Sequence, residues 1–187
     1  MSFGMIVLLI IVTAVGYLIM AYNRFASLRA GIDASWSDID VQLKRRYDLI
    51  PALVDTVRGY KDYEAETLEN VIKARQQGLS AGTMDEKAAA ANMISGALGK
   101  MFALAEAYPD LKANTNFLKP QGELSNLEDA IQSARRYYNA IVRDYNFRLE
   151  AFPDVFIAQR FNYTPRDYFE LDASEAAEVK KMPKIDL

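Results

Sequence analysis

The sequence predicts an all-α protein in which an N-terminal transmembrane helix continues into an antiparallel bundle of long helices. Three observations predict this fold: an uncharged apolar run at the start, apolar residues at helical heptad spacing in three later segments, and no convincing strand pattern. The length allows one domain with a core. We expect a short flank over residues 1–2, a transmembrane helix over 3–23, a bundle domain over 24–169 and a flexible polar tail over 170–187.

The apolar run extends from Phe3 to Tyr22, with no charged side chain before Arg24. Twenty helical residues at about 1.5 Å each span roughly 30 Å, the hydrocarbon thickness of a bilayer. A cleaved signal peptide usually carries positive charge before its apolar core and a cleavage site after it, and this run has neither. We therefore expect an uncleaved anchor, with Tyr17 and Tyr22 near the membrane interface.

The basic residues nearest to the span are Arg24 and Arg29, and both follow it. Positive charge tends to stay on the cytoplasmic side of a membrane. The sequence thus predicts a single-pass protein of the cell membrane, with its N-terminus outside and its bundle in the cytoplasm.

After the span, apolar residues recur at alternating steps of three and four, as on a helix packed lengthwise on others or in a coiled coil. This stripe consists of Ile32, Trp36, Ile39, Leu43, Ile50, Leu53 and Val57, with a gap at Arg46. Pro51 removes a backbone donor, so we expect a kink near Tyr47 to Pro51 and helix again through Gln77.

The segment Gly78 to Thr83 is predicted to be a turn, with Gly78 just past the helix end. A second striped helix follows, and then a third in which Ser125 and Glu128 suggest a capping box near its start. The second stripe comprises Ala91, Ile94, Leu98, Met101, Ala105 and Tyr108. The third comprises Leu124, Leu127, Ile131, Ala134, Tyr138, Ile141, Tyr145 and Phe152.

One pentapeptide occurs twice, as EAYPD from Glu106 and as EAFPD from Glu150. In both copies an aromatic residue ends a stripe, and the proline that follows forces the chain out of helical geometry. Asp110 and Asp154 stand where a turn or N-cap residue belongs. We therefore interpret the repeat as the exit of one helix and the entry of the next segment, not as a pair of catalytic carboxylates.

Composition excludes most catalytic chemistry. There is no cysteine and no histidine, which removes disulfides, thiolate nucleophiles, the commonest general base and the usual ligands of metal sites. The formal net charge of -3 argues against a nucleic-acid-binding surface. The phosphate-loop-like SGALGK, Ser95 to Lys100, lacks the first glycine, the Ser or Thr after lysine and a preceding strand. We expect no cofactor and no metal.

The segment KRRYD, Lys44 to Asp48, puts Arg46 in the apolar stripe. Such an arginine either extends out to solvent or pairs with a carboxylate. Its candidate partners are Asp48 nearby and Glu128 or Asp144 on a facing helix. A structural ion pair that fixes helix register is the first interpretation, and an anion or lipid-headgroup site beside Pro51 is the alternative.

Tyr138 with Asn139 and Tyr145 with Asn146 repeat at one heptad. Aromatic residues at this spacing are usually core, with their hydroxyls at polar edges, although a contact between subunits would use the same pattern. The aromatic segment that follows Pro153 is expected to pack along the bundle, because it holds too many aromatic side chains to leave in water: Phe156, Phe161, Tyr163, Tyr168 and Phe169.

Several of these stretches together resemble the LemA family of bacterial membrane proteins: WSDIDVQLKRRYDLIPALVDTVRGY, AEAYPDLKAN, ARRYYNAIVRDYN and LEAFP. The resemblance covers nearly the whole chain, from the span to about Phe169, and its motifs are long. It implies a single-pass anchor carrying a long-helix bundle, with no established enzymatic activity or cofactor. Two places depart from the pattern: Arg160-Phe161-Asn162-Tyr163 stands where a Gly-Phe pair is frequent, and Ala52 where asparagine is frequent.

The sequence therefore predicts a non-enzymatic scaffold or adaptor that self-associates or holds membrane or cytosolic protein partners at the bilayer, where anchoring raises local concentration. Two alternatives remain open. One is a protein that senses lipid or an anion through its aromatic segment or its arginines. The other is an enzyme, or a subunit of one, that works without histidine and cysteine.

Overall fold

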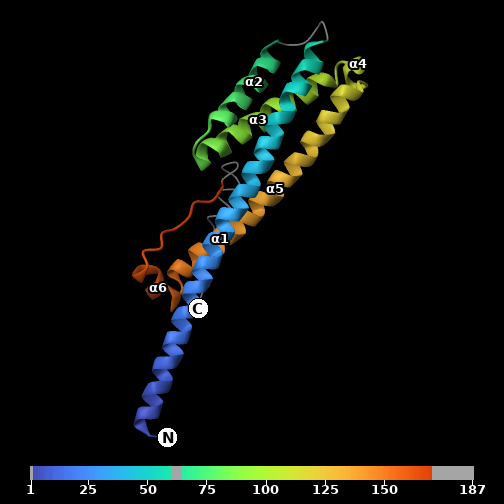
Figure 1. Cartoon of the computed structure of the whole chain (residues 1–187). Coiled ribbons are helices and arrows are strands. Elements are labelled where there is room, and N and C mark those ends of the chain that lie inside the picture. Colours follow the sequence, from blue (N-terminus) through green and yellow to red (C-terminus); the bar gives the residue numbers. More distant parts are fainter. Residues whose placement is uncertain (1, 60–64, 170–187) are drawn as a thin grey trace, which may run out of the picture. The chain divides into compact units, whose positions relative to one another are not determined.

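The computed structural model describes residues 2–59 and 65–169, and these residues contain helices and no strand. The predicted all-α class is confirmed. In chain order the helices are α1 (Phe3–Arg58), α2 (Ala65–Ser80), α3 (Met84–Ala105), α4 (Pro109–Lys112), α5 (Thr115–Glu150) and α6 (Asp154–Arg160) (Figure 1). The predicted polar tail, 170–187, lies outside the described residues.

The chain divides into two compact units. The first unit comprises Met1–Asp38 and Arg135–Tyr168, and the second comprises Ile39–Ala134 and Phe169–Leu187. Each unit has buried apolar side chains of its own, such as Phe25 and Tyr145 in the first and Leu43 and Ile94 in the second.

In the first unit, α1 runs antiparallel to α5. Phe25 contacts Tyr145 with ring centroids 5.9 Å apart, and Trp36 contacts Tyr138 at 6.0 Å. Residue numbers therefore rise along α1 in the direction in which they fall along α5. The side chains from Phe3 to Met20 take no part in this core. Most of them are apolar and exposed, and no residue in the most apolar 18-residue stretch of α1 is buried.

In the second unit, α1, α2, α3 and α5 form an up-down-up-down bundle. Lys87 of α3 pairs with Asp40 of α1, and Ser95 bonds Arg46, so these two helices run in the same direction. Thr56 of α1 contacts α5 near its start, whereas Arg46 contacts it further along, so these two are antiparallel. Such a bundle buries one stripe of each helix.

The predicted stripes are the buried faces of these helices. Every residue of the α1 stripe is buried except Trp36, which is half-buried. The α3 stripe is also buried, apart from half-buried Tyr108. α3 is long and apolar enough to cross a membrane by length and composition. However, 44% of its most apolar 18-residue stretch is buried, as expected of a core helix. On α5 the prediction fails at the end, because Phe152 is 80% exposed.

Three expectations about helix ends are wrong. α1 passes through Pro51 and ends at Arg58, so the helix is interrupted at Gly59 and does not run on to Gln77. Gly78 lies inside α2 and is buried, because the ring of Tyr47 occupies the space that a Cβ would need, 2.6 Å away. Ser125 lies inside α5, which already begins at Thr115, so it cannot cap the start of that helix.

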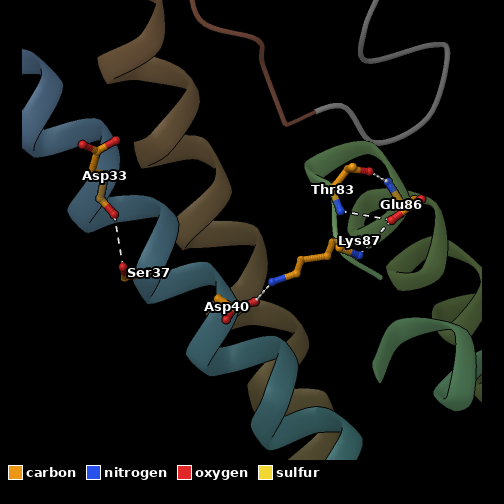
Figure 2. Close-up of polar contacts among 7 residues, drawn as sticks. Asp33, Ser37, Asp40, Thr83, Glu86 and Lys87 are labelled. Atoms are coloured by element: carbon orange, nitrogen blue, oxygen red, sulfur yellow. Dashed lines mark hydrogen bonds and ion pairs between the residues drawn. The ribbon is translucent and has the colours of Figure 1, made fainter. Parts of the chain in front are cut away.

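The capping box that the structure contains is at the start of α3, where Figure 2 shows Thr83 and Glu86 facing each other. The Glu86 backbone N–H donates to Thr83 Oγ1, and the Glu86 carboxylate accepts from the Thr83 and Gly82 backbone N–H groups. These backbone bonds lower the pKa of Glu86. Sequence reasoning missed this Thr-x-x-Glu pattern because it assigned Thr83 only to the turn.

Both copies of the repeated pentapeptide join helices as predicted. The first lies between α3 and α4, and the second between α5 and α6. Neither proline-bearing junction has a side-chain cap bond, and Asp110 and Asp154 lie in the first turn of the new helix, not at the N-cap. The Phe152–Pro153 peptide bond is cis.

Asn162 explains how the chain leaves α6. Its φ is 53°, in the left-handed region that favours glycine, and the Tyr163 N–H bonds the Ala158 carbonyl at 2.9 Å. Asparagine tolerates this region better than most residues other than glycine.

Candidate functional site

The most unusual polar group in the second unit is the guanidinium of Arg46, which is only 3% exposed. α1 places it in the apolar stripe, facing α3 and α5. One terminal nitrogen, Nη2, lies 2.8 Å from the Glu128 carboxylate of α5 and donates to Ser95 Oγ of α3 at 3.0 Å. One arginine therefore links three helices at a single level of the bundle.

Burial dominates the electrostatics of this cluster. It lowers the pKa of Arg46, an effect that the nearby charge of Glu128 opposes, and it raises the pKa of Tyr47. The Arg46 Nε and the Tyr47 hydroxyl are both buried and have no hydrogen-bond partner within the described chain. The carboxylate of Glu128 keeps contact with water, since its side chain is 31% exposed.

The other residues predicted around Arg46 lie elsewhere. Asp48 is exposed, and Asp144 is an exposed residue 3.9 Å from its neighbour Arg143. Glu128 is thus the carboxylate, of the three considered, that the fold brings to Arg46. Helical periodicity explains the choice, because Asp48 is two positions along α1 and points to a different side.

Pro51 is exposed and lies inside α1. Having no N–H, it leaves the carbonyl four residues earlier, that of Tyr47, without its helical donor. Arg75 of α2 supplies the missing bond, with Nε 2.8 Å from that oxygen. An interhelical contact therefore replaces the hydrogen bond that the proline removes.

Pro120 in α5 repeats the arrangement. The carbonyl it leaves without a donor belongs to Asn116, and Thr56 Oγ1 of α1 lies 3.4 Å from it while also bonding the Ala52 carbonyl at 2.9 Å. The second contact is long and correspondingly weaker. Both prolines thus coincide with polar contacts between helices.

In the first unit, three predicted residues of α5 bind the segment that follows α6. The Tyr138 hydroxyl donates to the Asp167 carbonyl at 3.0 Å and the Tyr145 hydroxyl to the Thr164 carbonyl at 3.1 Å. The Asn146 amide donates to the Arg166 carbonyl at 2.8 Å and accepts from the Arg166 N–H at 2.9 Å. Both tyrosines are buried within this chain, and Asn139 is half-buried.

Three of the four residues predicted to lie at or just after the membrane interface contact the C-terminal part of the first unit. The Tyr17 hydroxyl donates to the Asp154 carboxylate at 2.5 Å. The ring of Tyr22 packs against Phe161 with centroids 5.0 Å apart. Arg29 lies over the ring of Tyr163 at 5.8 Å, and Arg24 is exposed.

For Asp154 the sequence predicted only the role of a turn or N-cap residue. It is 5% exposed, and its second oxygen accepts from Arg148 at 2.7 Å. The repeated pentapeptide drew attention to Asp154. Its partners Tyr17 and Arg148 lie outside the pentapeptide, so the motif could not indicate these contacts.

The aromatic segment is only partly packed, contrary to expectation. Phe169 is buried, and Tyr163 and Tyr168 are half-buried, but Phe156 is 63% and Phe161 is 42% exposed. Phe152 pairs edge to face with Phe156 at 5.9 Å. These side chains therefore remain on the surface of the described unit.

Acidic groups do not gather into a metal site. Throughout residues 2–59 and 65–169, no three Asp or Glu side chains come together closely enough to hold a metal ion. The Asp40 and Lys87 side chains form an ion pair instead, as Figure 2 shows.

Comparison with known proteins identifies the family of this chain. A family model described as the LemA family matches residues 35–186. The chain belongs to the LemA family. A LemA protein of Metamycoplasma hominis is 31% identical over 144 residues, which cover 74% of this chain and 62% of that protein. The chain therefore spans less than two thirds of that relative.

More distant relatives are named as magnetosome proteins. MamQ 2 of Paramagnetospirillum magneticum is 22% identical over 186 residues, covering 86% of this chain and 68% of that protein. MamQ of Magnetospirillum gryphiswaldense is 22% identical over 178 residues, covering 81% and 65%. Together with the exposed apolar run of α1, the family makes this chain a membrane-associated helical protein.

Proposed function

We propose that this LemA-family chain is a membrane-anchored scaffold that self-associates, or holds partner proteins, at one face of a bacterial membrane. The observation that carries the proposal is the continuity of α1. Its exposed apolar run and the residues that enter the core of the first unit, such as Phe25 and Ile32, belong to one uninterrupted helix. Anchor and folded unit are thus one element, as suits a protein that presents a surface at the bilayer.

The use made of the polar side chains supports a scaffold over an enzyme. Arg46 and Glu128 bind each other, and Tyr138, Tyr145 and Asn146 bind the backbone of residues 164–167. Groups committed to holding helices and segments in place are poorly available for a substrate. Relatives named as a LemA protein and as magnetosome proteins further suggest that one helical frame serves in more than one setting.

The proposal includes a topology in which the bundle is cytoplasmic, supported by the exposed position of Arg24 and Arg29 just after the span. Since the chain contains no cysteine, Ser80→Cys at the exposed end of α2 gives one reporter thiol. A membrane-impermeant maleimide should label it only after lysis. Labelling in intact cells, with any outer membrane permeabilised, would show that the bundle lies outside the cytoplasm and would contradict this topology.

Self-association is tested on the full chain in mild detergent, by measuring its mass and by cross-linking. Exposed apolar side chains of the second unit include Met93 at 47% and Leu79 at 51%. A bis-maleimide should join Met93→Cys chains to each other or to partners, and Asp85→Cys on the same helix is the control. A monomer with no cross-linked product would contradict the scaffold.

A further inference from the structure

The short helix α6 and the residues on either side of it carry exposed aromatic side chains beside the apolar part of α1. Phe152, Phe156 and Phe161 are 80%, 63% and 42% exposed. In Figure 1 α6 lies next to the blue part of α1, and the Tyr17–Asp154 and Tyr22–Phe161 contacts fix it there. We call these three phenylalanines the aromatic patch.

The height of α6 along α1 follows from these contacts. Tyr17 precedes Tyr22, the last residue of the apolar run, by five residues, so Tyr17 lies about 7.5 Å inside the end of that run. At the same level the other faces of α1 are apolar and exposed, with Val15, Leu18 and Ile19 at 53%, 47% and 54%. Surfaces of this kind are covered by lipid in a transmembrane helix.

The charged groups of the region are arranged to tolerate this environment. A carboxylate at the edge of a bilayer is costly unless it is paired. Asp154 is buried and accepts from both Tyr17 and Arg148, so α6 meets α1 with its acidic group satisfied. Arg160 at the end of α6 is exposed, as suits a cation beside lipid headgroups.

We propose that the aromatic patch inserts into the membrane interface and gives the protein a second membrane contact besides its anchor. The inference rests on the proposed anchoring through α1. Short segments with aromatic residues on one face typically enter the boundary between headgroups and acyl chains. The occupant is the lipid surface itself, because Phe161 packs on Tyr22 at the end of the exposed apolar run of α1, and Asp154, which lies between Phe152 and Phe156 in the chain, bonds Tyr17 within that run.

The test places an environment-sensitive fluorophore on single cysteines in the full chain, reconstituted into vesicles of phosphatidylethanolamine and phosphatidylglycerol. Phe156→Cys reports on the patch and Val12→Cys on the anchor. Tyr137→Cys is the water-exposed control: Tyr137 is 62% exposed, and its neighbour Tyr138 packs on Trp36, about 20 Å along α1 from Tyr22. Unchanged helical circular dichroism confirms that each variant is folded.

We expect the Phe156→Cys label to emit further to the blue than the Tyr137→Cys label, and nitroxide-bearing lipids to quench it several-fold more strongly. Quenching at Val12 without quenching at Phe156 overturns the inference and leaves the anchor standing. A blue-shifted label at Phe156 that lipid nitroxides do not quench also overturns it, because protein then covers the patch. No quenching at Val12 overturns the anchoring, and this inference with it.

Discussion

At the scale of single residues, Arg46 shows how one polar side chain can hold a helical core together. A charge placed in an apolar stripe is costly by itself, and the cost is met through Glu128 and Ser95. The two partners of the ion pair are not equivalent, since Arg46 is 3% and Glu128 31% exposed. Removing Arg46 and removing Glu128 should therefore change the stability of the fold by different amounts.

We expect Glu128→Leu to destabilise the fold by about 3–5 kcal/mol, because it leaves the buried Arg46 charge unpaired. Arg46→Met should cost less, since the remaining carboxylate reaches water, and the double variant should recover most of the loss. Chemical unfolding in detergent, followed by circular dichroism, measures all three. Asp144→Asn, at an exposed pair, is the control and should change stability by no more than about 0.5 kcal/mol. Equal losses in both single variants would contradict this account.

Tyr138 gives the fold a dependence on alkaline pH. Burial raises its pKa to about 12, whereas an unfolded tyrosine titrates near 10. Stability from this group is complete below about pH 10 and is lost as pH rises through about 12, because the folded state holds the proton more tightly. Burial raises the pKa of Tyr145 and Tyr163 in the same direction.

Tyr138→Phe should cost about 1 kcal/mol at neutral pH by removing the bond to the Asp167 carbonyl. Between about pH 10 and 12 the variant should lose less stability than the parent, so that the difference shrinks or reverses. Unfolding curves across that range measure the effect. Tyr137→Phe, at an exposed position of the same helix, should leave the pH profile unchanged. A parallel fall of parent and Tyr138→Phe curves would rule out this role.

At the scale of elements, the long helices contain prolines because neighbouring helices replace the bonds that prolines remove. Arg75 of α2 bonds the Tyr47 carbonyl opposite Pro51, and Thr56 of α1 approaches the Asn116 carbonyl opposite Pro120. A proline inside an isolated helix costs about 3 kcal/mol, and part of that cost is the lost hydrogen bond. The Arg75 bond offsets that part at Pro51, whereas the long Thr56 contact offsets it only weakly at Pro120.

We therefore expect Arg75→Met to destabilise the protein by about 1–2 kcal/mol. In a Pro51→Ala background the same change should cost clearly less, because the introduced alanine restores the N–H that bonds the Tyr47 carbonyl. A double-mutant cycle measured by chemical unfolding gives the coupling. Lys73→Met, an exposed change on the same helix, is the control. Additive effects of Pro51→Ala and Arg75→Met would contradict the interpretation.

At the scale of the whole molecule, the apolar run of α1 indicates a location at a membrane. Its side chains from Phe3 to Met20 are exposed, and a soluble protein rarely leaves so large an apolar surface in water. The same helix continues into the core of the first unit, so the anchor cannot be removed without shortening a structural helix.

A charge in the middle of this run should weaken membrane attachment. Leu9→Arg and Val12→Arg should each oppose insertion by about 2.5–3.5 kcal/mol, and together they should release much of the protein from the membrane pellet after carbonate extraction. Val41→Arg, at an exposed apolar site of the second unit, should leave the protein in the pellet. Full retention of the doubly substituted protein would argue against a spanning α1.

The sequence by itself determined the features that repeat along one helix. The all-α class, the apolar run, the buried stripes of α1 and α3 and the anomalous position of Arg46 all depend on spacing within a segment, which is visible in the letters. The repeated pentapeptide likewise predicted a helix junction, because proline restricts the backbone conformation of the residue before it.

Only the tertiary structure decided which groups meet. The deciding contacts join residues that are far apart in the sequence. They are Arg46 with Glu128 instead of Asp48 or Asp144, Arg75 with the Tyr47 carbonyl, Tyr47 with Gly78, and Tyr17 with Asp154. Their meeting depends on the register between helices, and a register is set by the whole packed interface, so no local spacing encodes it. The exposure of Phe152 and Phe156 has the same origin, since it depends on where α5 ends against its neighbours.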